Sequence, residues 1–266
     1  MELQKFKDYL ILKDLDKNTI KHYVYTVKKF LEKVPNLNQE TVNQYFIKRQ
    51  EEVAEQTFNS DRNALSHYIR FKNLDIELPK NKKIPKKIKS IVTAEYFKKQ
   101  ILPMIDFIFT NPLKVKTILI FLFCTGLRRS EMANLKRSDI NIKDRIVKIR
   151  DPKNHKDRIV PYPTRVNKYL DMYFSAEAEE SSAFNISSQG IYDIFATMRP
   201  YFKEIENLSP HTFRHSFATY SMNNGMPIFT LKEILGHEDI KTTEQYVTIN
   251  LEDLKREVRD KLKNII

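Results

Sequence analysis

The stretch Arg145-Ile146-Val147-Lys148-Ile149-Arg150, followed after a polar turn by Arg158-Ile159-Val160-Pro161-Tyr162, alternates apolar and polar residues. A period of two places the apolar side chains on one face, as in a β-strand. The turn over residues 151–157 joins the two segments into a predicted β-hairpin with Lys153 near its tip. Elsewhere the apolar spacing is helical, so the sequence predicts a mainly α protein with a small β-sheet.

Upstream of the hairpin, Pro112 opens a strongly apolar segment that ends near Thr125-Gly126. Proline is favoured at the first position of a helix, and glycine supplies a left-handed stop. The longest apolar run, Ile118 to Cys124, covers about a third of a membrane span. The start of the chain also lacks a signal peptide's apolar centre, so we expect a cytoplasmic protein without a membrane partner. The single cysteine, Cys124, is interpreted as a buried small hydrophobe.

The N-terminal part of the chain also has helical spacing. Four segments, over residues 3–10, 20–31, 38–48 and 54–71, predict a small helical bundle with short connections. Asn18 and Thr19 are candidate caps of the second helix. The basic and aromatic residues of this part could face a DNA groove or form an ordinary wet surface, and the sequence does not choose between the two. We predict a first domain over residues 1–78.

Positive charge dominates the composition. The chain has 46 Lys and Arg against 34 Asp and Glu, a formal net charge of +12, which attracts a polyanion such as DNA. A linker is predicted over residues 79–90, because this stretch combines prolines with lysines and has no acidic residue. The alternative is a solvated surface loop. The candidate DNA-binding lysines of the linker are Lys80, Lys82, Lys83, Lys86, Lys87 and Lys89.

The segment Ser209-Pro210-His211-Thr212-Phe213-Arg214-His215 has the features of a helix start, with Ser209 as the cap. His211 and Arg214 then share one face, while Phe213, Phe217 and Tyr220 are expected to point into the core. A helix N-terminus with an imidazole and a guanidinium suits a phosphate. An ordinary surface pair is the alternative.

Three further motifs complete the set of candidate site residues. Arg128 follows the helix-stopping Thr125-Gly126, with Glu131 one helical turn beyond it. His237 follows a Leu-Gly pair, and Tyr246 follows a predicted capping box. Taken singly, these residues have simpler interpretations, such as an exposed Arg128–Glu131 pair or a tyrosine that packs with a wet hydroxyl.

In this order, the motifs resemble the tyrosine recombinase (phage integrase and Xer) family over nearly the whole chain. The resemblance implies an N-terminal helical bundle (SAM-like, core-binding) and an α+β catalytic domain over residues 91–266. It assigns Glu131 a supporting role. The catalytic residues that it implies are Arg128, Lys153, His211, Arg214, His237 and Tyr246. The hairpin tip reads Pro152-Lys153-Asn154 instead of the family's Gly-Lys-Gly, which leaves Lys156 as an alternative catalytic lysine.

The resemblance also implies the activity and the partners. A site-specific recombinase of this family cuts and rejoins DNA through a 3′-phosphotyrosine, without metal, ATP or another cofactor. Its partners are double-stranded DNA and copies of itself, as a dimer on each site and a tetramer in the synapse. A C-terminal helix would dock on a neighbouring subunit or pack on its own domain, through a stripe of Leu251, Leu254, Val258, Leu262 and Ile266. Two alternatives are a DNA-binding or architectural protein without catalysis and a type IB topoisomerase-like enzyme.

Overall fold

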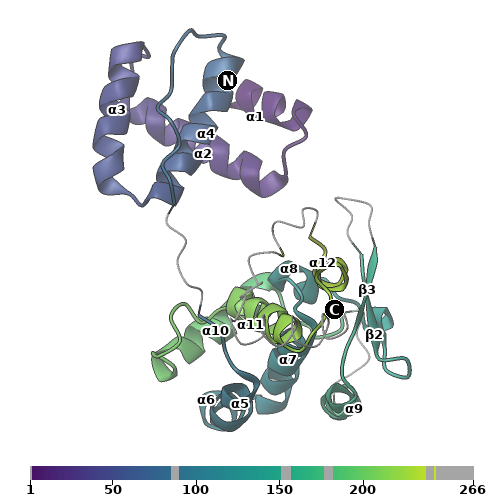
Figure 1. Cartoon of the computed structure of the whole chain (residues 1–266). Coiled ribbons are helices and arrows are strands. Elements are labelled where there is room, and N and C mark those ends of the chain that lie inside the picture. The colour runs from purple at the N-terminus through teal and green to yellow at the C-terminus, as the bar shows by residue number, and fades with distance from the viewer. Residues whose placement is uncertain (1, 85–89, 151–156, 177–181, 238–242, 244–266) are drawn as a thin grey trace, which may run out of the picture. The chain divides into compact units, whose positions relative to one another are not determined.

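The structure is a computed structural model that describes residues 2–84, 90–150, 157–176, 182–237 and 243 (Figure 1). The chain divides into two compact units, Met1–Lys87 and Ile88–Ile266. Each unit has its own buried apolar clusters. In the described ranges, no helix combines the length and the apolar character that a bilayer crossing needs.

The first unit contains the four helices expected from the sequence. They are α1 (Glu2–Leu12), α2 (Lys17–Lys33), α3 (Gln39–Glu52) and α4 (Glu55–Phe71). The predicted caps of α2 are wrong, because Asp16 accepts hydrogen bonds from the backbone N–H groups of Asn18 and Thr19 at 2.9 and 3.1 Å. A cap two residues before Asn18 satisfies these two N–H groups, which have no partner within the helix.

Residues 74–84, after α4, form no helix or strand and are bound to the same unit. Arg62 Nε donates to the carbonyl oxygen of Pro79 at 3.1 Å. Asn59 exchanges two hydrogen bonds with the backbone of Lys82, at 2.8 and 2.9 Å, and the Lys82 ammonium lies 4.8 Å from the centre of the Phe58 ring. The first part of the predicted linker is therefore held against α4.

The second unit is built around one apolar helix, α7 (Pro112–Thr125). Before it come α5 (Ala94–Tyr96), the π-helical turn η1 (Phe97–Ile101) and α6 (Leu102–Ile108). After it come α8 (Arg129–Ala133), the 3-10 turn η2 (Arg137–Asp139) and a small sheet. The remaining elements are α9 (Arg165–Ala176), α10 (Ser188–Met198), the 3-10 turn η3 (Arg199–Tyr201), α11 (Pro210–Asn223) and α12 (Ile228–Leu235).

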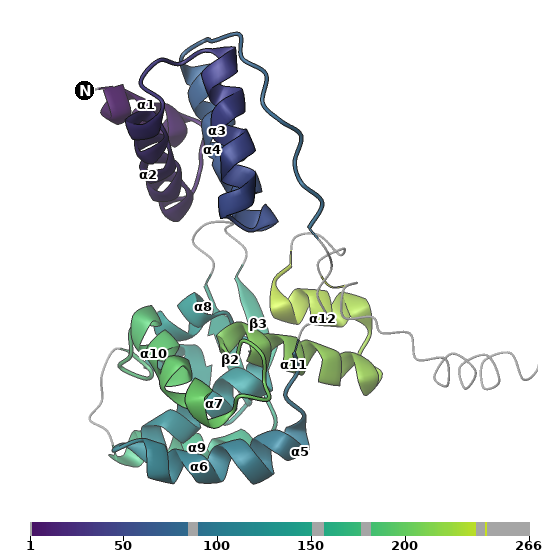
Figure 2. The same cartoon turned by 90° about the vertical axis from the view of Figure 1, so that its left-hand side faces the viewer.

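The sheet contains the hairpin that the alternating sequence predicts. Strands β2 (Ile146–Ile149) and β3 (Arg158–Pro161) pair antiparallel, with Val147 opposite Val160. A short strand β1 (Ile140–Asn141), which the sequence did not predict, pairs with the other edge of β2. Two residues are too few to show a period. In both views α12 lies beside β3 (Figures 1 and 2), so the sheet and this helix contribute to one region.

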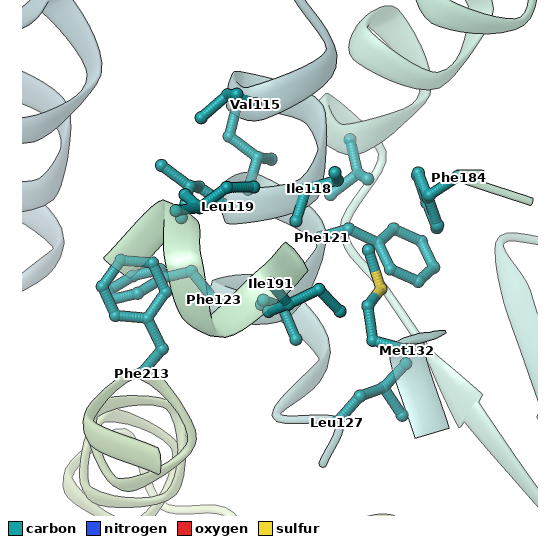
Figure 3. Packing of buried hydrophobic residues seen from close by; sticks show 14 of the residues in the cluster. Val115, Ile118, Leu119, Phe121, Phe123, Leu127, Met132, Phe184, Ile191 and Phe213 are labelled. Carbon is teal, nitrogen blue, oxygen red and sulfur yellow. The ribbon is translucent and has the colours of Figure 1, made fainter. Parts of the chain in front are cut away.

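The core holds α11 against α7. Nearly every side of α7 is buried, which is why its sequence is apolar all round. Figure 3 shows Phe123 of α7 beside Phe213 of α11, and their ring centroids are 5.3 Å apart in an edge-to-face arrangement. This packing fixes the helix start that carries His211 and Arg214.

One predicted core residue of α11 is not buried. Phe213 is buried and Phe217 is partly buried, but the side chain of Tyr220 is 56% exposed. Tyr220 lines an open, mostly apolar cavity of about 730 Å³, so the core does not close over it. Cys124 lines the same cavity, and burial raises the pKa of its thiol to about 11.

Candidate active site

The site begins where α7 ends. Gly126 adopts a left-handed conformation with φ of +64°, which is strained for any residue with a Cβ. A Cβ at this position would lie 2.4 Å from Cδ1 of Phe217, so the turn also needs a residue without a side chain. The chain then reverses through buried Leu127 and places Arg128 directly before α8.

Arg214 reaches this turn from α11. Ser209 caps that helix by accepting the N–H of Thr212 at 3.2 Å, and Pro210 occupies the first helical position, as predicted. Arg214 is only 3% exposed. Its Nη1 donates to the carbonyl oxygen of Gly126 at 2.8 Å, and its Nη2 donates to that of Leu235 at 2.6 Å. Arg214 is therefore an interior residue that joins the ends of α7 and α12, and the surface-pair alternative is wrong for it.

Arg128 and Arg214 both donate hydrogen bonds to carbonyl oxygens at the end of α12. Gly236 stops the helix in a left-handed conformation with φ of +63°. Its carbonyl oxygen accepts a hydrogen bond from Nη2 of Arg128 at 2.7 Å, one residue after the carbonyl that binds Arg214. The two guanidinium groups are thus bound to successive carbonyls of one turn, which also carries His237.

Glu131 holds Arg128 from the other side. Its Oε1 accepts from Nη1 of Arg128 at 2.8 Å, and its Oε2 accepts from the backbone N–H of the same residue at 2.7 Å. Burial alone would raise the pKa of Glu131, but hydrogen bonds and charge from Arg158, and then from Arg128, outweigh burial and lower it. Glu131 is therefore an ionised, mostly buried partner of Arg128.

His237 is kept neutral by its surroundings. Its Nδ1 lies 2.8 Å from Oγ1 of Thr243, which is fully buried. Loss of hydration and nearby positive charge both disfavour the imidazolium, so the pKa of His237 is lowered to about 4. After burial, the groups that contribute most to this shift are Arg214, Arg128, Arg158 and His211.

His211 lies at the start of α11 with an exposed side chain. Its ring centroid is 4.1 Å from that of His215, and the two rings are steeply inclined. His215 is buried, so it supports the imidazole of His211 from inside the unit rather than lying on the surface. The other extra histidine of the sequence, His155, lies outside the described residues.

Five of the predicted site residues come together at the ends of α7 and α12 and the start of α11. They are Arg128, Glu131, His211, Arg214 and His237. Lys153 and Tyr246 lie outside the described residues, as does the alternative lysine Lys156.

The predicted DNA-binding lysines are only partly described. Lys80 and Lys83 are exposed and Lys82 is half-buried, all within the first unit. Lys86, Lys87 and Lys89 lie outside the described residues.

Arg158 is a member of this network that the sequence interpretation did not single out. Its Nη1 and Nη2 donate to the two carboxylate oxygens of Glu131 at 2.9 and 2.8 Å, and its Nε donates to the carbonyl oxygen of Ile234 at 2.8 Å. A signal was present in the strand pattern. Arg158 is two residues from buried Val160, so it shares the inward face of β3, where an arginine needs a partner.

A metal ion has no evident set of ligands in this part of the chain. Among the described residues, no three His, Cys, Asp or Glu side chains form a group that could hold one. The described site is instead cationic: Arg128 and Arg158 share the carboxylate of Glu131, and Arg214 is bound to the carbonyl oxygens of Gly126 and Leu235. Guanidinium groups gathered in this way are suited to a phosphate.

Comparison with known proteins points to one family. The family model described as the phage integrase family matches residues 97–252. A protein named tyrosine recombinase XerA from Pyrococcus furiosus is 31% identical over 280 residues, which are 99% of this chain and 96% of that protein. The XerA protein of Pyrococcus horikoshii is also 31% identical and covers 99% of this chain and 94% of its own.

Solved structures share the fold. An integrase of transposon Tn1549, in complex with circular intermediate DNA, has a TM-score of 0.73 at 17% identity and covers 98% of this chain and 99% of its own. A lambda integrase dimer bound to a COC′ core site has a TM-score of 0.71 at 15% identity, with coverages of 92% and 93%. The sequence predicted a mainly α protein with a small sheet, and these structural similarities confirm that fold class.

Proposed function

The chain belongs to the phage integrase family of tyrosine recombinases and is by family a site-specific DNA recombinase, and we propose that its nucleophile is the hydroxyl of Tyr246. The observation that carries this proposal is the turn over Leu235 and Gly236, to which Arg128 and Arg214 are both bound and from which His237 follows. Two guanidinium groups at one point of the molecule are suited to one phosphodiester.

The position of Tyr246 along the chain supports its role. Tyr246 follows His237 by nine residues and buried Thr243 by three. Three residues of chain extend no farther than about 11 Å. Because Thr243 is hydrogen-bonded to His237, this short length of chain supports Tyr246 as the candidate nucleophile, for the site of its own subunit or of a neighbouring one.

The proposed step is a displacement at phosphorus. The phenol oxygen of Tyr246 forms a bond to the phosphorus while the bond to the 5′ oxygen breaks, which leaves a 3′-phosphotyrosine and a free 5′-hydroxyl. His211 takes the phenol proton, and Lys153, by family resemblance, supplies a proton to the departing 5′ oxygen. The reverse reaction with a second 5′-hydroxyl rejoins the strands without ATP.

Arg128 and Arg214 would neutralise the charge that develops on the non-bridging oxygens. Neutral His237 would donate from Nε2, because an acceptor role of Nδ1 toward the Thr243 hydroxyl leaves the ring proton on the other nitrogen. Glu131 supports the site by holding Arg128 in place.

We propose that the two units have different roles in DNA binding and catalysis. Residues 1–78 would form a core-binding domain, residues 79–90 a basic linker and residues 91–266 the catalytic domain. The net charge of +12 supports double-stranded DNA as the partner. A dimer on each site, a tetramer in the synapse, a docked C-terminal helix and a cytoplasmic location remain predictions.

The proposal is tested with DNA that traps the covalent intermediate. The full chain first selects a binding duplex from a random-sequence pool. Versions of this duplex are then prepared with a nick at each successive position. Where the nick lies close to the cleaved bond, the short strand released by cleavage diffuses away and religation fails. We expect a protein–DNA adduct on denaturing gels, formed in EDTA by the wild type and absent from Tyr246→Phe. An adduct that persists in Tyr246→Phe would refute the choice of nucleophile.

A second arm separates recombination from topoisomerase-like relaxation. The same protein is incubated with a supercoiled plasmid that lacks the selected site and with one that carries two copies of it. We expect recombinant products only from the second plasmid. Efficient relaxation of the first plasmid, without recombinants from the second, would favour the topoisomerase-like alternative.

A further inference from the structure

Arg158 makes the most extensive polar contacts of the hairpin strands. Its side chain is 10% exposed, and its guanidinium binds the carboxylate of Glu131 through two parallel hydrogen bonds of 2.8 and 2.9 Å. This fork-to-fork geometry is the strongest and most directional arrangement of a guanidinium with a carboxylate. The strand is therefore fixed to α8 at the point where Glu131 binds Arg128.

Glu131 divides its carboxylate between two arginines. Oε1 accepts from Nη1 of Arg158 and Nη1 of Arg128, and Oε2 accepts from Nη2 of Arg158 and the backbone N–H of Arg128. A carboxylate has about four lone-pair directions, and these four hydrogen bonds use them. Neither arginine can be removed without changing how Glu131 binds the other.

The charge of this group depends on Arg158. Arg128, Arg158 and Glu131 carry two positive charges and one negative charge, so the trio has a net charge of +1. Without Arg158, the carboxylate would face Arg128 alone and the pair would be neutral. Arg128, which is 39% exposed and thus open to a ligand, would then attract a phosphate less strongly.

Arg158 also reaches the turn that carries His237. Its Nε donates to the carbonyl oxygen of Ile234, in the last turn of α12. A Cβ on Gly236 would lie 2.9 Å from Nη1 of Arg158, so the guanidinium packs directly under this turn. The same turn accepts Arg128 through the Gly236 carbonyl. One side chain therefore connects β3, α8 and the end of α12.

We propose that Arg158 is a positioning residue of the active site, which balances the charge of Glu131 so that Arg128 keeps its own charge for the phosphate, and which fixes the turn before His237. This inference rests on the proposed strand cleavage. A merely structural role makes a different prediction. If Arg158 only stabilised the fold, the effect of replacing it would not depend on whether residue 131 carries a charge.

The test is a double-mutant cycle on single-turnover cleavage of the nicked duplex at saturating protein. We expect Arg158→Met to form adduct about 10²-fold more slowly than the wild type, since a small misplacement or neutralisation of a catalytic group has effects of this size. In Arg158→Met/Glu131→Gln the uncompensated carboxylate is gone. This double variant should recover about tenfold relative to Arg158→Met, a factor within the range of coupling between contacting groups.

Two single variants serve as controls. Arg158→Lys keeps the charge but not the fork, so its rate should lie between those of the wild type and Arg158→Met. Lys148→Met removes the same charge from the neighbouring strand, where Lys148 is exposed and lies opposite Ile159, and it should cleave like the wild type. Circular dichroism at the assay temperature checks that each variant is folded.

A readout without DNA separates this inference from the proposed function. Nuclear magnetic resonance titration of His237 should give a higher pKa in Arg158→Met than in the wild type, because one of the cations around the imidazole is lost. The other charged or titratable groups that affect His237 are Arg214, Arg128 and His211. If the wild type forms no adduct, the proposed function fails while this titration still tests the network. An unchanged His237 pKa, or a double variant as slow as Arg158→Met, would overturn the role given to Arg158.

Discussion

The pKa of His237 depends on its burial and on the charged groups around it. Burial is the largest cause of its low pKa, and the nearby arginines add to it. A histidine with a pKa of about 4 is neutral throughout the physiological range, so it serves as a hydrogen-bond donor or acceptor rather than as a positive charge. Among Arg128, Arg214 and His237, the positive charge for a phosphate therefore comes from the two arginines.

The pH dependence of stability follows from the same shift. Because the folded pKa of about 4 lies below the ordinary value of 6.5, the unfolded chain binds a proton at this site first as the pH falls. The contribution of neutral His237 is complete above pH 6.5 and is lost progressively toward pH 4. Urea unfolding should show the wild type losing more stability across this window than His237→Asn. Equal losses in the two proteins would contradict the assigned shift.

Thr243 provides a second test at the scale of single residues. Its buried hydroxyl lies 2.8 Å from Nδ1 of His237 and supplies a hydrogen-bond partner for that ring nitrogen. Thr243→Val has nearly the same shape without the hydroxyl, and leaving the ring nitrogen unsatisfied costs about 1–3 kcal/mol. We expect slower adduct formation in Thr243→Val and near-normal rates in Thr243→Ser. Equal rates of adduct formation in Thr243→Val and Thr243→Ser would show that the Thr243 hydroxyl has no role in the site.

At the scale of elements, two helix ends build the site. Gly126 ends α7 and Gly236 ends α12, both in the left-handed conformation, and the carbonyl of each accepts a hydrogen bond from an arginine. These turns are positioned by packing, since Phe217 of α11 covers Gly126 and the guanidinium of Arg158 covers Gly236. The polar groups of the site thus lie at the packed C-terminal ends of these two helices.

Gly126→Ala should be much more damaging than Gly225→Ala. Both glycines have positive φ, so each alanine carries strain of about 1–2 kcal/mol, but only Gly126 also meets a neighbour, Phe217, whereas a Cβ on Gly225 would meet nothing within 4 Å. Overpacking adds about 1–3 kcal/mol to the loss of unfolding free energy for Gly126→Ala. Chemical denaturation of the two variants measures the difference.

A compensating change tests the cause. Adding Phe217→Leu to Gly126→Ala removes the ring that the new Cβ would meet at 2.4 Å, so part of the lost stability should return. If the double variant is less stable than Gly126→Ala alone, steric overlap is not the reason for the loss.

The sequence predicted those elements in which the pattern of apolar residues extends over many positions or changes clearly from a helical to a strand period. The helices of the first unit, α7 and the β2–β3 hairpin were all predicted, because each repeats its pattern over several residues. β1 has two residues and η1 is a π-helical turn, and neither leaves a period to detect. Tyr220 was misplaced because the helical pattern cannot show where a core stops and a cavity begins.

The site was predictable only in part. Motifs indicated Arg128, Glu131, His211, Arg214 and His237, and the structure brings these together. The motifs did not indicate that Glu131 is shared with Arg158, because that contact joins residues 27 positions apart in sequence. Long-range pairing of this kind depends on the packing of β3 against α8 and α12, which no local pattern encodes.

At the scale of the whole molecule, the overall charge and the candidate site have different roles. The net charge of +12 attracts DNA without selecting a sequence, while Arg128 and Arg214 are proposed to bind one phosphate. Lys82 is held over the ring of Phe58, so among the described lysines of residues 79–84 it is Lys80 and Lys83 that are exposed.

Lys80→Ala/Lys83→Ala should weaken DNA binding without changing cleavage of bound DNA. Each lost phosphate contact lowers the slope of binding affinity against salt concentration by about one. A matched control is Lys29→Ala/Lys48→Ala, which removes two charges that are paired with Glu32 and Glu52 on helices of the same unit. An equal drop in slope for the control would show that net charge, rather than these two lysines, determines the affinity.

The most direct measurement of the central proposal is peptide mapping of the covalent adduct by mass spectrometry. The wild-type adduct on the nicked duplex is digested with protease and nuclease, and the peptide that carries the nucleotide is sequenced. We expect a 3′-phosphonucleotide on Tyr246, within reach of Arg128, Arg214 and His237. A nucleotide on any other residue, or an adduct that forms equally well after Arg214→Ala, would contradict a single site assembled from these groups.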